Sequence, residues 1–391
     1  MSTYSLASPW QLAIFLIILS LSFQLIVSMS RSHKQNNTLY GIETILIIVS
    51  FAIFGYCTSP WPADDLYRYF NEMYLMSING WSYAVNFGTW RVNFISNAIL
   101  YVFSQFEDYH LLPMVTTALI PLIFFKVYKI GDKSLSASVY VLLFIEFLFG
   151  ATVNIYQTIS MIRFSLGCEL AIMVMYLDAT KTINNKLILL VLYALLPFVH
   201  TSMVVIDFTV LMANFVHNKY IKYSLFVFLP LLAGSSLATN VGSSIPIISS
   251  ITSKISFYEG VYSTGTSFWL TLATFLITIT IFVIVAMWPK GLADGGYNIK
   301  LSPSEVSLRL KLREYFLDTF IVALILFPFT QAIFFRFTFL MFMLGVPLLI
   351  DFFSSFREFS WKALSGLLIL GGASVLWFYQ WSNYFSIWQF I

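Results

Sequence analysis

Charged side chains are scarce in this sequence of 391 residues: Asp, Glu, Lys and Arg together make up 10% of it, against about 25% in a typical soluble domain. Only two cysteines are present, Cys57 and Cys168, and they lie in or beside different apolar runs. This spacing argues against a disulfide framework and a thiolate metal site, and we expect neither a metal nor a cofactor. No basic block carries the interleaved aromatic residues of a single-strand binding groove, so we expect no nucleic-acid partner.

Apolar residues dominate instead. They make up 59% of the chain, which contains 40 Phe, 22 Tyr and 10 Trp. Many stand in runs that approach or exceed the roughly 17–25 residues needed to cross a bilayer, whereas a β-barrel would show short alternating segments. We therefore predict an all-α polytopic membrane protein with about twelve transmembrane helices (about 11–13). The predicted spans are residues 10–29, 39–56, 111–129, 135–151, 158–178, 187–200, 202–217, 223–239, 267–288, 316–334, 337–354 and 363–381.

The positive charges indicate the orientation. All but five of the 21 Lys and Arg residues fall in connections that can face one side, which the positive-inside rule identifies as the cytoplasm. Both termini are then extracytoplasmic. No Lys or Arg precedes the first run, so we expect a retained helix and not a cleaved signal peptide. The orientation gives two large outer loops, 57–110 with interfacial helices and 240–266, which could act as a mobile lid. It also gives a cytoplasmic loop, 289–315, whose basic helix would lie along the lipid headgroups.

Five basic residues map to the outer side, against the rule. Four of them are arginines, although lysine is well represented on the inner side. Arginine presents a planar fork that suits phosphate, whereas lysine is a point charge. We therefore expect the outer arginines to hold an anionic group. The five exceptions are Arg68, Arg91, Arg163, Lys254 and Arg336.

The first outer loop begins with the densest polar cluster of the chain. Asp64 can cap a helix whose first turn carries Asp65. On that helix Asp64, Arg68 and Glu72 would share one face, because they are four residues apart. They could form a solvent-facing series of ion pairs, or a carboxylate pair able to accept a proton or hold a cation. Four polar or aromatic residues, in this loop or at the opening of the span 158–178, are candidates for sugar contacts: Tyr69, Trp90, Tyr156 and Gln157.

Three further residues stand out by their position. Arg163 lies roughly 8 Å below the outer end of the span 158–178, where a charged side chain is costly and usually functional. Arg336 is expected at an outer turn between two spans. His200 is the only histidine in an apolar setting near the outer face. It could be a hydrogen-bonded structural group, or a general base.

Four of these segments, in this order along the chain, resemble the Wzy/EpsG-type polysaccharide polymerases, which are integral membrane glycosyltransferases of the GT-C kind. The chain departs from the family pattern at Pro62-Ala63, where a glycine is expected, and at Met73, where a tyrosine is expected. The matching segments are Asp65-x-x-x-Tyr69, Ile162-Arg163-Phe164-Ser165-Leu166, Val199-His200-Thr201-Ser202, and Arg336 before the Phe-rich helix 337–354.

The resemblance implies a GT-C-like fold in the bacterial cytoplasmic (inner) membrane, and polymerisation of oligosaccharide repeat units on the extracytoplasmic face. The donor and the acceptor would both be glycans linked to undecaprenyl diphosphate, and a partner protein could regulate chain length. Arg163 and Arg336 would clamp the diphosphate, with secondary contacts from Arg91 and Arg68. Asp65 is the preferred base for the acceptor hydroxyl, and Asp64 and His200 are alternatives.

Other classes remain open at this stage. A flippase or transporter of lipid-linked sugars would need charged residues along a path across the membrane, and often shows repeated halves, which we do not find in the sequence. A membrane O-acyltransferase acting on polysaccharide would use His200 as its base. A ligase that transfers finished glycan to another acceptor has the same chemical needs as a polymerase.

Overall fold

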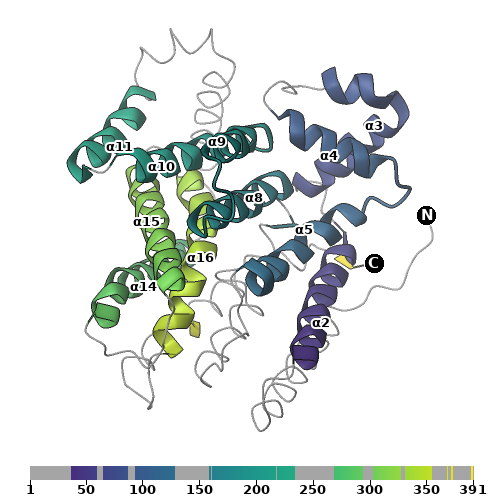
Figure 1. The fold of residues 1–391 in the computed structure, drawn as a ribbon. Helices are drawn as coiled ribbons and strands as arrows, with labels where there is room; N and C mark the ends of the chain where they lie inside the picture. Colours follow the sequence, from purple (N-terminus) through teal and green to yellow (C-terminus); the bar gives the residue numbers. More distant parts are fainter. Residues whose placement is uncertain are drawn as a thin grey trace. The chain divides into compact units, whose positions relative to one another are not determined.

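The described part of the chain is helical, apart from one short pair of strands (Figure 1). Strand β1 (Thr58–Ser59) pairs antiparallel with β2 (Gln389–Phe390). The expectation of an all-α chain is confirmed for these residues. The computed structural model describes residues 37–59, 65–86, 93–127, 158–159, 161–216, 218–233, 268–293, 303–326, 331–354, 368, 371–372 and 389–390.

The chain forms two compact units. The first comprises Met1–Asn86, Asn97–Glu169 and Arg357–Ile391, and the second comprises Phe87–Ser96 and Leu170–Phe356. The first unit contains α2 (Asn37–Tyr56), α3 (Asp65–Asn86), most of α4 (Phe94–Ser104), α5 (Leu111–Leu122) with the π-helical turn η1 (Ile123–Val127), and the start of α8 (Ile162–Ala179).

In the first unit, α2 and α5 pack closely because small side chains line their contact. Gly55 of α2 faces the Pro113 carbonyl and the Thr117 hydroxyl of α5 so closely that a Cβ atom would overlap both. The Thr117 hydroxyl also donates a 2.8 Å hydrogen bond to the Phe51 carbonyl across the contact. Close packing at small residues is typical of helix pairs in apolar surroundings.

The second unit begins with helices that have clear sequence signals at their ends. α8 ends where Lys181 takes a positive φ of 53°. α9 (Lys186–Leu195) begins after Asn185, whose side chain accepts a hydrogen bond from Leu187 N. The 3-10 turn η2 (Leu196–Phe198) contains Pro197 and separates α9 from α10 (Met203–Phe215). The expected break near His200 is therefore confirmed as a break between two helices.

The remaining helices of the second unit pack around α15. They are α11 (Lys219–Ala233), α14 (Phe268–Ala293), α15 (Pro303–Leu326) and α16 (Gln331–Ser354). α15 contacts α10, α11, α14 and α16, and α14 also contacts α16. Tyr315 and Phe316 of α15 and Leu340 of α16 are fully buried in this core.

The second unit differs from expectation between 303 and 315. These residues belong to the continuous helix α15, which runs on to Leu326. Arg309 is buried and pairs with Asp351, while Arg313 donates to the carbonyls of Val285 (3.0 Å) and Ala286 (3.2 Å). The expectation of a surface helix here is wrong, because these arginines have partners on two neighbouring helices.

Several helices keep an apolar face uncovered. On α2, α9 and α14 the exposed apolar side chains recur every four residues, so they form one stripe along each helix. No helix within the described residues has both the length and the apolar character needed to cross a membrane. The stripes consist of Ile45, Val49 and Ile53 on α2, of Leu187, Val191 and Leu195 on α9, and of Phe275, Ile279, Val283 and Met287 on α14.

Candidate functional site

The candidate site lies in the first unit and is built on the first two turns of α3. Arg68 forms an ion pair with Asp65 one turn before it, with 3.2 Å between Nη2 and Oδ1. It also approaches Glu72 one turn after it, with 3.5 Å between Nε and Oε1. Residues three and four apart are neighbours on a helix surface, so the sequence spacing itself sets up this pairing. Asp65 also stands in the first turn, where the helix dipole favours a carboxylate.

A second arginine reaches this cluster from α8. The guanidinium carbon Cζ of Arg163 lies 4.6 Å from the centroid of the Tyr69 ring, and that of Arg68 lies 5.3 Å from the same ring. Tyr69 is buried, and its electron-rich face attracts both cations. The ring therefore holds two guanidinium groups beside one carboxylate pair, although Arg68 and Arg163 belong to helices that are distant in sequence.

Glu72 is the most deeply placed acidic group of the cluster. The residue is 6% exposed, and its Oε2 atom has no hydrogen-bond partner among the described residues. Burial raises the pKa of the Glu72 carboxyl above its usual value, while Arg163 and Arg68 act in the opposite direction. A carboxyl in this position can change its protonation state when its arginine neighbours are redirected.

The four charged side chains, which are Asp65, Arg68, Glu72 and Arg163, define the candidate site, here called the α3–α8 cluster. Arg68 is accessible, since 53% of its side chain is exposed, whereas Glu72 lies beneath it. The exposed guanidinium fork of Arg68 suits a phosphate or diphosphate group. No group of three metal-binding side chains occurs within the described ranges.

A group of aromatic rings surrounds His110 in the first unit, and sequence reasoning gave this histidine no role. The His110 ring packs edge-to-face on Phe70 of α3, with 5.1 Å between ring centroids, and lies 5.9 Å from the Tyr56 ring of α2. Burial lowers the pKa of His110, while Asp108 and backbone groups of Thr58 and Tyr56 act in the opposite direction. The imidazole lies at a junction between α2, α3 and α5.

Other predicted site residues fall into different places. His200 belongs to the second unit, where its Nδ1 accepts a 3.2 Å hydrogen bond from Ser202 N at the start of α10. This local bond favours the structural interpretation of His200 over that of a base. Arg336 lies inside α16 and not in a turn, because α16 already begins at Gln331. The predicted residues outside the described part are Asp64, Trp90, Arg91, Tyr156 and Gln157.

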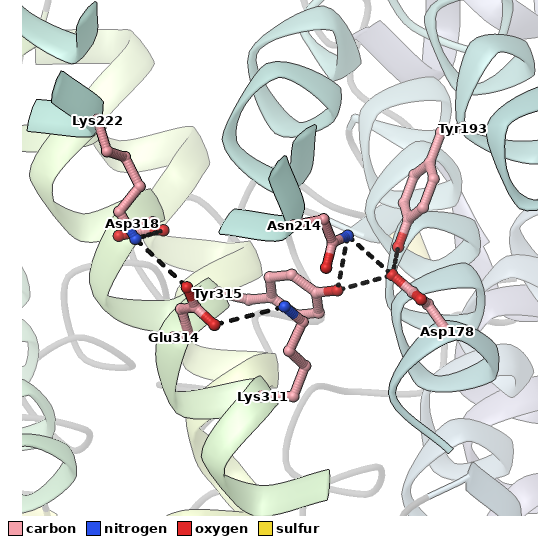
Figure 2. Close-up of polar contacts among 8 residues, drawn as sticks. All are labelled: Asp178, Tyr193, Asn214, Lys222, Lys311, Glu314, Tyr315 and Asp318. Carbon is pink, nitrogen blue, oxygen red and sulfur yellow. Dashed lines mark hydrogen bonds and ion pairs between the residues drawn. The ribbon is translucent and has the colours of Figure 1, made fainter. Parts of the chain in front are cut away.

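Sequence reasoning missed a polar network in the second unit (Figure 2). The Asp178 carboxylate of α8 accepts hydrogen bonds from three side chains through one oxygen, Oδ2. The donors are the hydroxyl of Tyr315 at 2.9 Å, Nδ2 of Asn214 at 3.0 Å and the hydroxyl of Tyr193 at 3.4 Å. Helices α8, α9, α10 and α15 meet at this carboxylate.

Ion pairs extend the network along α15. Lys222 of α11 pairs with Asp318 and Glu314 of α15, as Figure 2 shows. The distances are 2.7 Å to Asp318 and 3.4 Å to Glu314. Arg309 and Asp351 join α15 to α16 at 2.7 Å. Each of these cations already has a carboxylate partner, and both of the close pairs are buried. The arrangement fixes how the helices pack, because a buried charge that lost its partner would be costly.

The two polar centres therefore differ in what they can bind. In the second unit, the Lys222–Asp318 and Arg309–Asp351 pairs match their charges within the protein. In the α3–α8 cluster, Arg68 is accessible and Glu72 is incompletely bonded within the described residues. Protein-family models, curated proteins and solved structures were each compared with the chain, and none matches it. The function must be inferred from the residues and their geometry.

Proposed function

We propose that the chain is a membrane glycosyltransferase that polymerises oligosaccharide repeat units carried on undecaprenyl diphosphate at the extracytoplasmic face. The observation that carries this proposal is the meeting of Arg163 with Asp65, Arg68 and Glu72 around the Tyr69 ring. Two guanidiniums and an accessible carboxylate supply the two functions that the reaction needs, namely charge stabilisation of a departing diphosphate and acceptance of a proton.

The roles of Arg68 and Asp65 follow from their exposure, and that of Arg163 from its contact with the same Tyr69 ring. Arg68 and Arg163 would bind the diphosphate of the donor lipid, and their hydrogen bonds would strengthen as charge builds on the departing oxygen. Asp65, whose side chain is 35% exposed, would take the proton of the acceptor hydroxyl. The hydroxyl oxygen then forms a bond to the anomeric carbon of the donor, while the bond from that carbon to the diphosphate oxygen breaks. The lipid diphosphate leaves with the bonding electrons.

Membrane embedding is part of the same proposal. It is supported by the apolar content of 59% and by the exposed apolar stripes on α2, α9 and α14. Contiguous exposed apolar surface indicates contact with lipid or a partner protein. In a lipid environment the stripes would face acyl chains, and the substrate's polyprenyl tail would occupy the same phase as the helices.

A transporter of lipid-linked glycans is the second candidate. The buried Lys222–Asp318 pair favours it, because ionisable groups buried between the helices of a membrane protein often mark transport paths. A saturated pair that joins α11 to α15 is equally explained as a structural contact. The two candidates predict different locations for unpolymerised repeat units.

The test is a glycan profile of a strain in which the gene is deleted and then restored. Gels and mass spectrometry would compare rescue by the wild type, by Arg163→Lys and by Lys186→Ala, an exposed control on α9. The polymerase proposal expects single repeat units outside the cell and no long chains with Arg163→Lys, and normal chains with the control. Repeat units retained on the inner leaflet would favour the transporter, and normal chain length with altered acylation would favour an O-acyltransferase.

A further inference from the structure

The charges of the α3–α8 cluster cancel. Arg68 and Arg163 contribute two positive charges, and Asp65 and Glu72 contribute two negative ones when both carboxyls are ionised. A diphosphate brings additional negative charge to the same guanidiniums. The cluster can bind the diphosphate strongly only if one of its two carboxylates releases its ion pair with the arginines.

Glu72 and Asp65 are not equivalent in this respect. The Asp65 side chain is 35% exposed, so water can solvate its charge when Arg68 turns away. The Glu72 side chain is 7% exposed, and its ionised form depends on the nearby guanidiniums of Arg68 and Arg163. An ionised carboxylate that is buried and loses its compensating cations binds a proton instead.

We propose that Glu72 competes with the substrate diphosphate for Arg68 and Arg163, and that it takes up one proton from solvent when the diphosphate binds. This inference rests on the proposed function, because it assumes that the α3–α8 cluster is the diphosphate site. When the diphosphate leaves, the arginines return to Glu72 and the proton is released. Glu72 is therefore a charge-balancing residue, and the base for the acceptor hydroxyl is the more exposed Asp65.

The groups that set this equilibrium are few among the described residues. Asp65 and Arg68 belong to the same helix as Glu72, and Arg163 approaches from α8. Tyr69 contacts both guanidiniums through its ring. Redirecting the two arginines removes the two interactions that hold down the pKa of Glu72, while the effect of burial persists.

Proton uptake can be measured by titration calorimetry on the purified full chain in detergent. The probe is farnesyl diphosphate, and the titration is repeated in buffers of different ionisation enthalpy near neutral pH. The dependence of the observed heat on buffer gives the protons exchanged. The wild type should take up about one proton more than Glu72→Gln. Glu107→Gln, at an exposed carboxylate outside the cluster, is the matched control and should keep the wild-type uptake.

The probe's own phosphate groups also exchange protons, so the difference between the wild type and Glu72→Gln is the decisive quantity. Glu72→Gln should bind farnesyl diphosphate at least as tightly as the wild type, because the amide does not compete for the arginines. If Glu72→Gln does not fold, a difference infrared spectrum of the wild type replaces it. Binding should then produce the carbonyl band of a protonated carboxylic acid.

The outcomes separate the two proposals. Equal proton uptake by the wild type and Glu72→Gln, with binding that still depends on Arg163, would overturn the role of Glu72 and leave the diphosphate site standing. The absence of a new carboxylic acid band in the wild type on binding would do the same. If farnesyl diphosphate does not bind to the wild type, or binds equally to Arg163→Lys, the proposed function itself is wrong.

Discussion

The guanidinium of Arg163 lies over the aromatic ring of Tyr69, with 4.6 Å from Cζ to the ring centroid. Tyr69 is buried on α3 and Arg163 stands in the first turn of α8, so the contact joins two helices. A flat cation held on a flat ring has a fixed orientation. We interpret this contact as the feature that aims Arg163 at its ligand.

Replacement of Tyr69 should separate orientation from charge. Tyr69→Phe keeps the ring and should retain most activity, whereas Tyr69→Leu removes the cation–π contact, which contributes about 1–2 kcal/mol. We expect Tyr69→Leu to lower glycan polymerisation about tenfold in an assay of chain length against time. Tyr67→Leu, on an exposed side chain of the same helix, is the control. Equal activity of the Phe and Leu variants would show that the ring does not orient Arg163.

Gly55 should tolerate no side chain. A Cβ atom there would overlap the Pro113 carbonyl and the Thr117 hydroxyl, so Gly55→Ala must push α2 away from α5. Overpacking of this kind costs about 1–3 kcal/mol. We expect a lower midpoint of thermal unfolding, measured in detergent. Gly372→Ala, where the added Cβ meets no atom within 4 Å, should leave the midpoint unchanged or raise it. An unchanged midpoint for Gly55→Ala would contradict the close packing of α2 on α5.

The Arg309–Asp351 pair predicts a non-additive pair of substitutions. Asp351→Leu alone leaves a buried guanidinium without its carboxylate and should cost about 3–5 kcal/mol of unfolding free energy. Arg309→Met together with Asp351→Leu removes both charges and should recover most of that loss. Chemical denaturation of the four proteins in this cycle measures the coupling. Additive effects of the two single changes would show that the two charges are not coupled.

Acid should destabilise the first unit through His110. Burial lowers the pKa of this histidine in the folded chain below that of the unfolded chain. The folded state therefore binds fewer protons, and the stability contribution is present above the unfolded pKa. It is lost as pH falls from about 6.5 through the folded pKa. Thermal unfolding midpoints from about pH 8 to about pH 5 should fall less steeply for His110→Gln. The same acid dependence in both proteins would assign the effect to another group.

The sequence predicted local features of the α3–α8 cluster better than tertiary ones. The spacing of Arg68 and Glu72 follows from helix periodicity, and both the helix after Asp64 and the break near His200 have local signals. The contact between Arg163 and Tyr69 depends on how α3 and α8 pack, which no local pattern encodes. Sequence reasoning therefore placed Arg163 in the same site but did not predict its stacking partner, and it assigned no separate role to Glu72.

The partners of the charged residues near position 309 could not be predicted from the sequence. The sequence predicts a surface helix in the loop 289–315, because its basic residues stand between two apolar spans. Arg309 instead finds Asp351 on α16, and Lys222 finds Asp318 on α15. Such partners are far apart along the chain, so charge alone could not distinguish a headgroup contact from a buried pair.

The most direct test of the central claim is polymerisation by the purified chain in liposomes. Lipid-linked repeat units extracted from the deletion strain serve as both donor and acceptor, and mass spectrometry follows product length and released lipid diphosphate. Our account predicts that the wild type forms a ladder of longer glycans and releases one lipid diphosphate for each bond formed, and that Arg163→Lys does not. Repeat units that remain single with the wild type, or a full ladder with Arg163→Lys, would contradict it.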